Sequence, residues 1–169
     1  EYPDNKIEKV LTCFTDTDKW TEFYLPEIVD IPIVKPDIEG IVEIHSQIEI
    51  ISQRVIKTPV VNGYTGSNGV YIQGENIPNS ECTNLTGRKL IIEGLLKQKI
   101  IYTAAVDEQS IHSASFVIPF STFIIIEKDT PLSQKFRITP YVEDIFAYRL
   151  SERSVFKNTT IFIKASRIC

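Results

Sequence analysis

The sequence predicts an all-β protein, an antiparallel β-sandwich of long strands preceded by an extended N-terminal arm. The first observation is a period of two along several runs from residue 38 onward, which is typical of strands with one buried face. The second is that apolar residues are hardly ever found at helical spacing in the same runs. Consecutive strands without intervening helices usually pack as two antiparallel sheets, so the runs together predict a sandwich.

The N-terminal residues 1–27 are expected to be an arm or connector, followed by a β-sandwich domain at 28–169. The arm is polar, acidic and bounded by prolines, yet it contains apolar side chains that a free tail would not need. We expect these side chains to dock on the chain's own core or on a neighbouring subunit. The candidate inter-subunit contacts are Val10, Leu11, Phe14, Trp20, Phe23 and Tyr24.

The strands begin after a short connecting segment. Residues 26–32 are β-branched and flanked by prolines, which suits an edge strand or an extended connector. The first long strand is expected at residues 41–58. Its buried side would carry Val42, Ile44, Ile48, Ile50 and Ile56. Its polar side would mostly carry Glu43, His45, Gln47, Glu49 and Gln53.

A glycine-rich loop is expected at residues 61–86, with a short hairpin around residues 70–73. Residues 89–105 then resume the alternation, and a polar turn at 107–110 leads into residues 111–127, so the two runs predict a long antiparallel hairpin. One face of the first run would carry Leu90, Ile92, Leu96, Ile100 and Tyr102. Pro119 in the second run predicts a bulge or a sheet edge.

Two further strands are expected at residues 136–150 and 155–165, both rich in β-branched and aromatic residues. Residues 142–153 would also fit one face of a helix, but the surrounding strands favour a strand there.

Composition excludes several classes of protein. The chain has 169 residues, 43% hydrophobic and 24% charged, which suits one domain with an arm. Its formal net charge of -4 makes nucleic acid an unexpected partner, because binders of phosphate usually carry a basic excess. No apolar run approaches the roughly 18 residues of a membrane span. The start lacks the pattern of a secretory signal. Because the chain contains no methionine, we expect that residues before Glu1 were removed or left out, so this absence is weak evidence.

The three cysteines, Cys13, Cys82 and Cys169, are odd in number and lack metal-binding spacing. All three lie outside the strand-like runs. They are either idle surface thiols or disulfides within or between subunits of a durable assembly outside the reducing cytosol. Their peripheral placement slightly favours the disulfides.

The sequence offers little for catalysis, a cofactor or a metal, and we expect none of them. His45 and His112 each have a serine nearby in the sequence, but both are expected on the polar faces of strands. Glu143 and Asp144 are adjacent, so in a regular strand they would point to opposite faces and could not act as an acid/base pair.

Several segments together resemble the SPOCS domain of spore-coat and spore-surface proteins in endospore-forming Firmicutes, especially clostridia. The resemblance extends from Pro36 to Ala165. It is carried by Thr58 to Val60, Asn84 to Gly94, Lys97 to Tyr102, Gln109 to His112, Phe116 to Ile124 and Tyr141 to Ile145. It implies a protein without known catalysis that takes part in building the spore coat.

Two functions follow from the arm, the thiols and the resemblance. The first is a self-assembling subunit of a spore-surface layer, fibre or appendage, in which the arm adds a strand to a neighbour's sheet edge. The alternative is a non-polymeric coat-morphogenetic adaptor that binds another coat protein in the mother cell. Both place the protein at the spore surface or coat after synthesis in the mother-cell cytoplasm. An enzyme using His45 or His112 is a distant third.

Overall fold

The structure is a computed structural model that describes residues 18–60, 63–72 and 85–168. These residues form eight strands and no helix, so the all-β prediction is confirmed. The strands are β1 (Lys19–Asp30), β2 (Ile38–Val60), β3 (Tyr64–Thr65), β4 (Tyr71–Ile72), β5 (Thr86–Ala104), β6 (Ile111–Ile125), β7 (Phe136–Arg149) and β8 (Ser154–Arg167). Within this part of the chain there is accordingly no helix that could cross a membrane.

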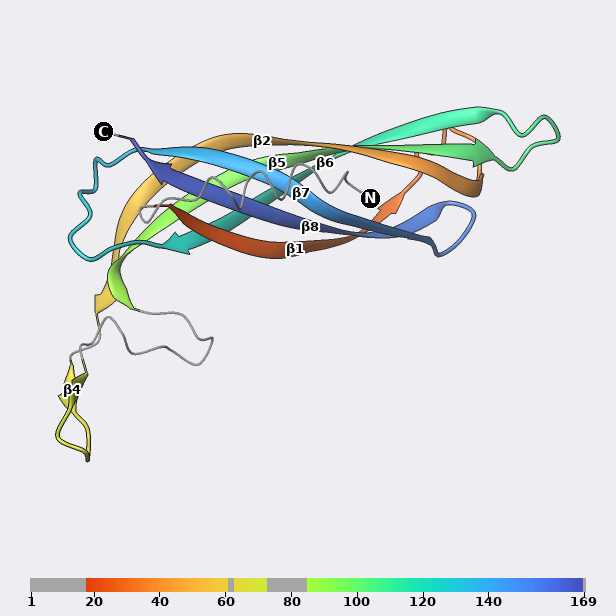
Figure 1. Ribbon diagram of the computed structural model, residues 1–169. Helices are drawn as coiled ribbons and strands as arrows, with labels where there is room; N and C mark the ends of the chain where they lie inside the picture. Colours follow the sequence, from red (N-terminus) through yellow and green to blue (C-terminus); the bar gives the residue numbers. More distant parts are fainter. Residues whose placement is uncertain (1–17, 61–62, 73–84, 169) are drawn as a thin grey trace.

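Two three-stranded sheets make up the body of the protein (Figure 1). Sheet A has the order β1-β8-β7, and sheet B has the order β2-β5-β6. Every pairing is antiparallel, and β2 lies beside β7 while β1 lies beside β6. The inner faces of the two sheets therefore enclose the core, as in the predicted sandwich. β3 and β4 form a separate short hairpin in the expected glycine-rich loop.

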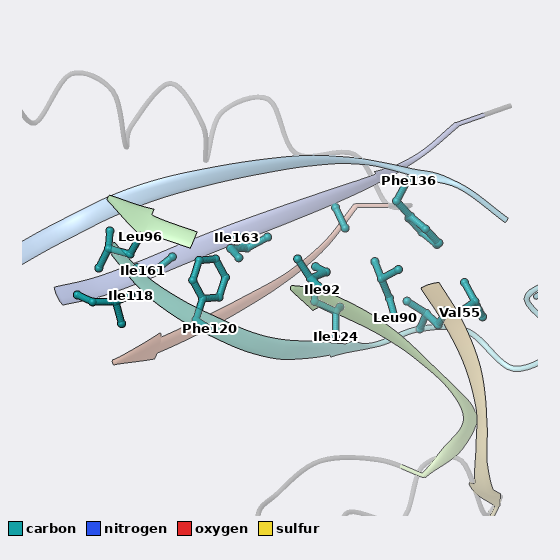
Figure 2. Close-up of a cluster of buried hydrophobic side chains, with 12 residues drawn as sticks. Val55, Leu90, Ile92, Leu96, Ile118, Phe120, Ile124, Phe136, Ile161 and Ile163 are labelled. Atoms are coloured by element: carbon teal, nitrogen blue, oxygen red, sulfur yellow. The ribbon is translucent and has the colours of Figure 1, made fainter. Parts of the chain in front are cut away.

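The core consists of two hydrophobic clusters at different levels along the strands. The larger cluster joins β2, β5 and β6 of sheet B to β7 and β8 of sheet A (Figure 2). Its buried members include Val55, Leu90, Ile92, Leu96, Phe120, Ile161 and Ile163. The smaller cluster contains Val29, Ile31, Ile38, Ile100, Tyr102, Ala114 and Val155.

A polar layer separates the two clusters. Gln98 of β5 donates from Nε2 to the Oγ1 of Thr159 in β8 at 2.8 Å and to the Oγ of Ser46 in β2 at 2.9 Å. Lys157 is the next inward residue of β8, and its side chain is completely buried. Its Nζ makes no hydrogen bond within the described part of the chain, and burial lowers its pKa to about 8, opposed by the charge of Glu27.

The predicted alternation in the first long strand is correct only from Ile44 to Ile50. Register shifts between Ile41 and Glu43 and between Ile50 and Ser52 mark β-bulges in β2. Val42 sits at the first bulge and is exposed, contrary to expectation. Beyond the second bulge the parity is reversed, so the Gln53 side chain turns inward. Its Nε2 donates to the carbonyl oxygen of Phe136 at 2.6 Å, and its Oε1 accepts the N–H of Phe136 at 2.8 Å.

The remaining strand predictions are mostly confirmed. β5 and β6 form the predicted long hairpin. Pro119 lies in regular register on the edge strand β6, so the predicted sheet edge is correct and the predicted bulge is wrong. Residues 142–149 continue β7 and do not form a helix. The expectation that Glu143 and Asp144 face opposite sides is wrong, because the register shift between Val142 and Asp144 makes Glu143 a bulge residue.

Candidate assembly surface

The edge strand β1 is the part of the predicted arm that the structure describes. It pairs with β8 along its whole length, and the boundary expected after residue 27 falls inside this strand. Phe23 and Leu25 point inward and pack against the larger core cluster, with the Phe23 and Phe120 ring centroids 5.4 Å apart. Trp20 and Tyr24 project from the opposite side and are exposed. Phe23 therefore contacts the core of its own chain in this structure.

Within the described part of the chain, one long side of β1 has no strand paired to it. Pro26 lies opposite Asn158 and has no N–H, which is tolerated where the backbone points away from the partner strand. In an antiparallel ladder the pairs alternate, so the backbone groups of Glu22, Tyr24 and Ile28 also point away from β8. These groups form an open strand edge.

A groove runs along the first half of this open edge. It has a volume of about 810 Å³ and is lined by residues 18–23 of the β1 end, residues 122–127 of the β6 end, and Thr86. β1 and β6 belong to different sheets, so the groove separates two strand edges. Among the strands that the structure describes, β8 is therefore the only one that holds β1 in place by backbone pairing.

The connection from β1 to β2, residues 31–37, is held by one arginine from the turn between β7 and β8. The Nη2 of Arg153 donates to the carbonyl oxygens of Ile31, Pro32 and Lys35 at 3.1, 2.8 and 3.1 Å. Its Nη1 forms an ion pair with Asp37. Arg153 therefore clamps the segment that joins β1 to the rest of the domain.

Replacing this clamp should loosen the connection. Arg153→Ala removes the side-chain donor to the carbonyls of Ile31 and Lys35 and to the carboxylate of Asp37, whereas the Pro32 carbonyl keeps the N–H of Lys35. We expect the variant to lower the free energy of unfolding by about 1–3 kcal/mol. Urea unfolding of both proteins measures the difference. Arg137→Ala is the matched control, because Arg137 is exposed on β7. Equal stability of the two variants would show that the arginine contacts do not hold the connection.

The outer face of sheet A is unusually aromatic. Alternate residues on all three strands project from it, and we call the surface formed by six of them the aromatic face. These six are Trp20, Tyr24, Phe146, Tyr148, Phe156 and Phe162. Trp20 stacks on Phe162 with ring centroids 5.5 Å apart, yet Trp20, Tyr24, Phe146 and Tyr148 each keep more than half of their surface exposed.

Two carboxyl groups meet on the same face. Glu143, displaced by its bulge, is hydrogen-bonded to Glu22 of β1. Partial burial, the hydrogen bond to Glu22 and the charge of Glu22 together raise the pKa of Glu143 to about 7. A nearby cation would relieve this repulsion. Lys164 lies on the same side of β8 and forms an ion pair with Asp18 at 3.2 Å.

Several of the predicted site residues lie outside the described residues. They are Cys13, Cys82, Cys169, Val10, Leu11 and Phe14. Their roles as cross-links and inter-subunit contacts stay predictions.

The two histidines lie in separate places. The Nε2 of the exposed His45 is 3.3 Å from a carboxylate oxygen of Glu43, and the Nε2 of His112 is 3.1 Å from the Oγ of Ser110. His112 stacks on Tyr102, and among the described residues no carboxylate orients it as in a catalytic triad. In the same part of the chain, no group of three His, Cys, Asp or Glu residues could hold a metal ion.

Comparison with known proteins gives one result. A family model described as SipL, SPOCS domain, matches residues 37–149, which is more than half of the chain. No curated protein and no solved structure matches the chain. The matched region begins in the connection between β1 and β2 and ends with β7, so it contains sheet B and leaves β1 and β8 outside.

Proposed function

Because the chain belongs to the SPOCS-domain family, we propose that it is a structural, self-assembling subunit of a spore-surface layer, fibre or appendage. The family indicates a role in sporulation with other sporulation proteins as partners, and it is not known for enzymes. In this proposal the N-terminal arm of one subunit adds a strand to the sheet of the next. The protein would then act at the spore surface or coat, after synthesis in the mother-cell cytoplasm.

The observation that carries this proposal is the position of β1. It supplies Phe23, Leu25 and Val29 to the core, yet it is an edge strand that pairs with β8 alone among the strands of residues 18–60, 63–72 and 85–168. Its other side lines an open groove, and a single short connection joins it to β2. A strand held in this way at a sheet edge can be replaced on β8 by the identical strand of another chain.

Exchange of β1 would make an open-ended assembly. When residues 31–37 extend, β1 of one subunit can occupy the same register on β8 of the next and fill the same core positions. Each subunit gives up its own β1 and receives the identical strand of a neighbour, which makes such swapping a low-cost route to oligomers. An interface repeated from head to tail gives a filament unless the chain of subunits closes into a ring.

The cysteines would make this assembly durable. Cys13 lies in the same arm and would travel with β1 to the neighbouring subunit, and Cys82 and Cys169 are further candidates for the cross-link. A disulfide between subunits persists when individual domains unfold, provided that the assembly lies outside the reducing cytosol.

A pair of introduced cysteines tests the exchange directly. Pro26→Cys and Asn158→Cys would face each other across β1 and β8, at a non-hydrogen-bonded pair whose geometry suits a disulfide. Cys13, Cys82 and Cys169 are first replaced by serine. We expect oxidised assemblies to give a ladder of linked chains on a non-reducing SDS gel, because each new disulfide joins two subunits.

The controls separate the competing outcomes. Either cysteine alone should give no such ladder. Regular filaments with only an internally linked monomer band would show that β1 stays in its own subunit. A uniform small particle without polymer, seen by negative-stain microscopy, would instead favour the coat-morphogenetic adaptor that binds another coat protein.

A further inference from the structure

The aromatic face is too apolar to be an ordinary solvent-facing side of a sheet. Antiparallel sheets usually carry polar residues on the side away from the core, whereas here every strand of sheet A contributes aromatic rings. Trp20 and Tyr24 are 57% and 65% exposed, and Phe146 and Tyr148 are 53% and 60% exposed. Several exposed aromatic side chains on one face of a sheet indicate a contact with another segment or molecule.

The N-terminal residues 1–17 are the nearest chain available to cover it. They lead directly into β1, whose first outward residue, Trp20, belongs to the aromatic face. Seventeen residues span about 26 Å as a helix. The three strands of sheet A are only about 10 Å across between the outer backbones. The segment therefore has ample length to return over the sheet from its edge.

The sequence of this segment also fits the surface. Ile7, Val10, Leu11 and Phe14 follow the spacing i, i+3, i+4 and i+7, which places them on one stripe of a helix. Thr12 would lie on the opposite side of the same helix. The stripe would give the aromatic rings an apolar partner.

Charge favours the same partner. The outer side of sheet A holds Glu22 and Glu143 at hydrogen-bond distance from each other, with Asp144 beside them on β7. Residues 5–15 of the N-terminal segment carry Lys6, Glu8 and Lys9, a net charge of +1, and the acids Glu1, Asp4 and Asp16 lie outside this stretch. A lysine near the carboxyl pair would reduce its repulsion.

We infer that residues 5–15 pack as an amphipathic helix on the aromatic face of the sheet to which their own β1 belongs, with Ile7, Val10, Leu11 and Phe14 against the rings. The contact covers the outer face of sheet A, while β1 completes its edge and its inner face. This contact does not depend on strand exchange. Residues 5–15 are joined to β1 and stay next to it, both in an isolated chain and in an assembly.

Hydrogen exchange of the full-length chain, kept dilute enough to be monomeric, tests the inference. We expect the amides of residues 5–15 to exchange about tenfold or more slowly than in a free peptide of the same sequence. Leu11→Asp should abolish this protection, because it places a charge against the rings. Thr12→Asp, on the opposite side of the helix, should retain it. Protection of β1 and β8 reports in each case that the sandwich is intact.

A change on the sheet side completes the test. Phe146→Ser combined with Tyr148→Ser should also remove protection from residues 5–15 while β5 and β8 stay protected. Unprotected amides in the unaltered chain, or equal effects of Leu11→Asp and Thr12→Asp, would overturn the inference. Protection that appears only at concentrations where copies associate would also overturn it, since the segment would then cover another copy. Strand exchange is read separately from the cysteine ladder, so either idea can fail alone.

Discussion

Replacing the buried lysine by methionine is expected to stabilise the protein at neutral pH. Lys157 lies in the polar layer between the two core clusters, completely buried, and its Nζ has no hydrogen-bond partner in the described part of the chain. Burial lowers its pKa from 10.5 to about 8. At pH 7 the folded state therefore contains an unfavourable buried charge, which Lys157→Met removes at similar side-chain length.

The pH dependence gives this prediction its sign. Below about pH 8 Lys157 is protonated in both the folded and the unfolded state. The full free-energy cost of burying its charge is then present, on the order of 3 kcal/mol. Between about pH 8 and 10.5 the unfolded chain holds more protons than the folded one, so wild-type stability gains from this group as the pH rises. The advantage of Lys157→Met should therefore shrink to about 1 kcal/mol at pH 10.

Urea unfolding at pH 7 and pH 10 measures both quantities. Lys99→Met is the matched control, because Lys99 is exposed on the outer side of sheet B and its loss should be nearly neutral at either pH. A constant difference between Lys157→Met and the wild type across this range would show that the lysine titrates normally. A destabilised variant at pH 7 would show that the amine contributes more by its contacts than its burial costs.

The fold could be predicted where the alternation is uninterrupted. The five residues expected on the buried side of the run at 89–105 are all completely buried in β5. The alternation fails in β2 and β7, where bulges shift the parity by one residue. Nothing local distinguishes Val42 or Glu143 from their neighbours, because a bulge is determined by pairing with a distant strand.

The candidate assembly surface was harder to predict from the sequence. The pattern indicated that Phe23 and Tyr24 would dock, but only the pairing with β8 shows that they project to opposite sides of sheet A. Arg153 acts on carbonyl groups more than a hundred positions away in the chain, which local spacing cannot reveal. Lys157 did carry a signal, since it shares its parity with Val155 and Ile161. Its charge argues against burial, and the parity proves to be the better guide.

A chain that begins at Ile31 is expected to lose its folded state and to regain it when a peptide of residues 18–30 is added. The deletion removes Phe23 and Leu25 from the core together with the backbone pairing to β8. Losing a core phenylalanine or leucine side chain costs about 2–5 kcal/mol. Two such losses are comparable with the whole stability of a domain, about 5–15 kcal/mol.

The peptide restores what the deletion removes, because β1 packs and pairs as a separate edge strand. Tertiary circular dichroism of the truncated chain should recover with peptide concentration to a saturating level, and native gels should show a one-to-one complex. A peptide with Phe23→Ala and Leu25→Ala is the matched control and should bind far more weakly. Recovery of the folded state with the added peptide would show that the β8 edge can pair with a strand from another molecule. Assembly by strand exchange requires this. A truncated chain that folds cooperatively by itself would show that β1 is dispensable to the sandwich, and strand exchange would then lose its driving force.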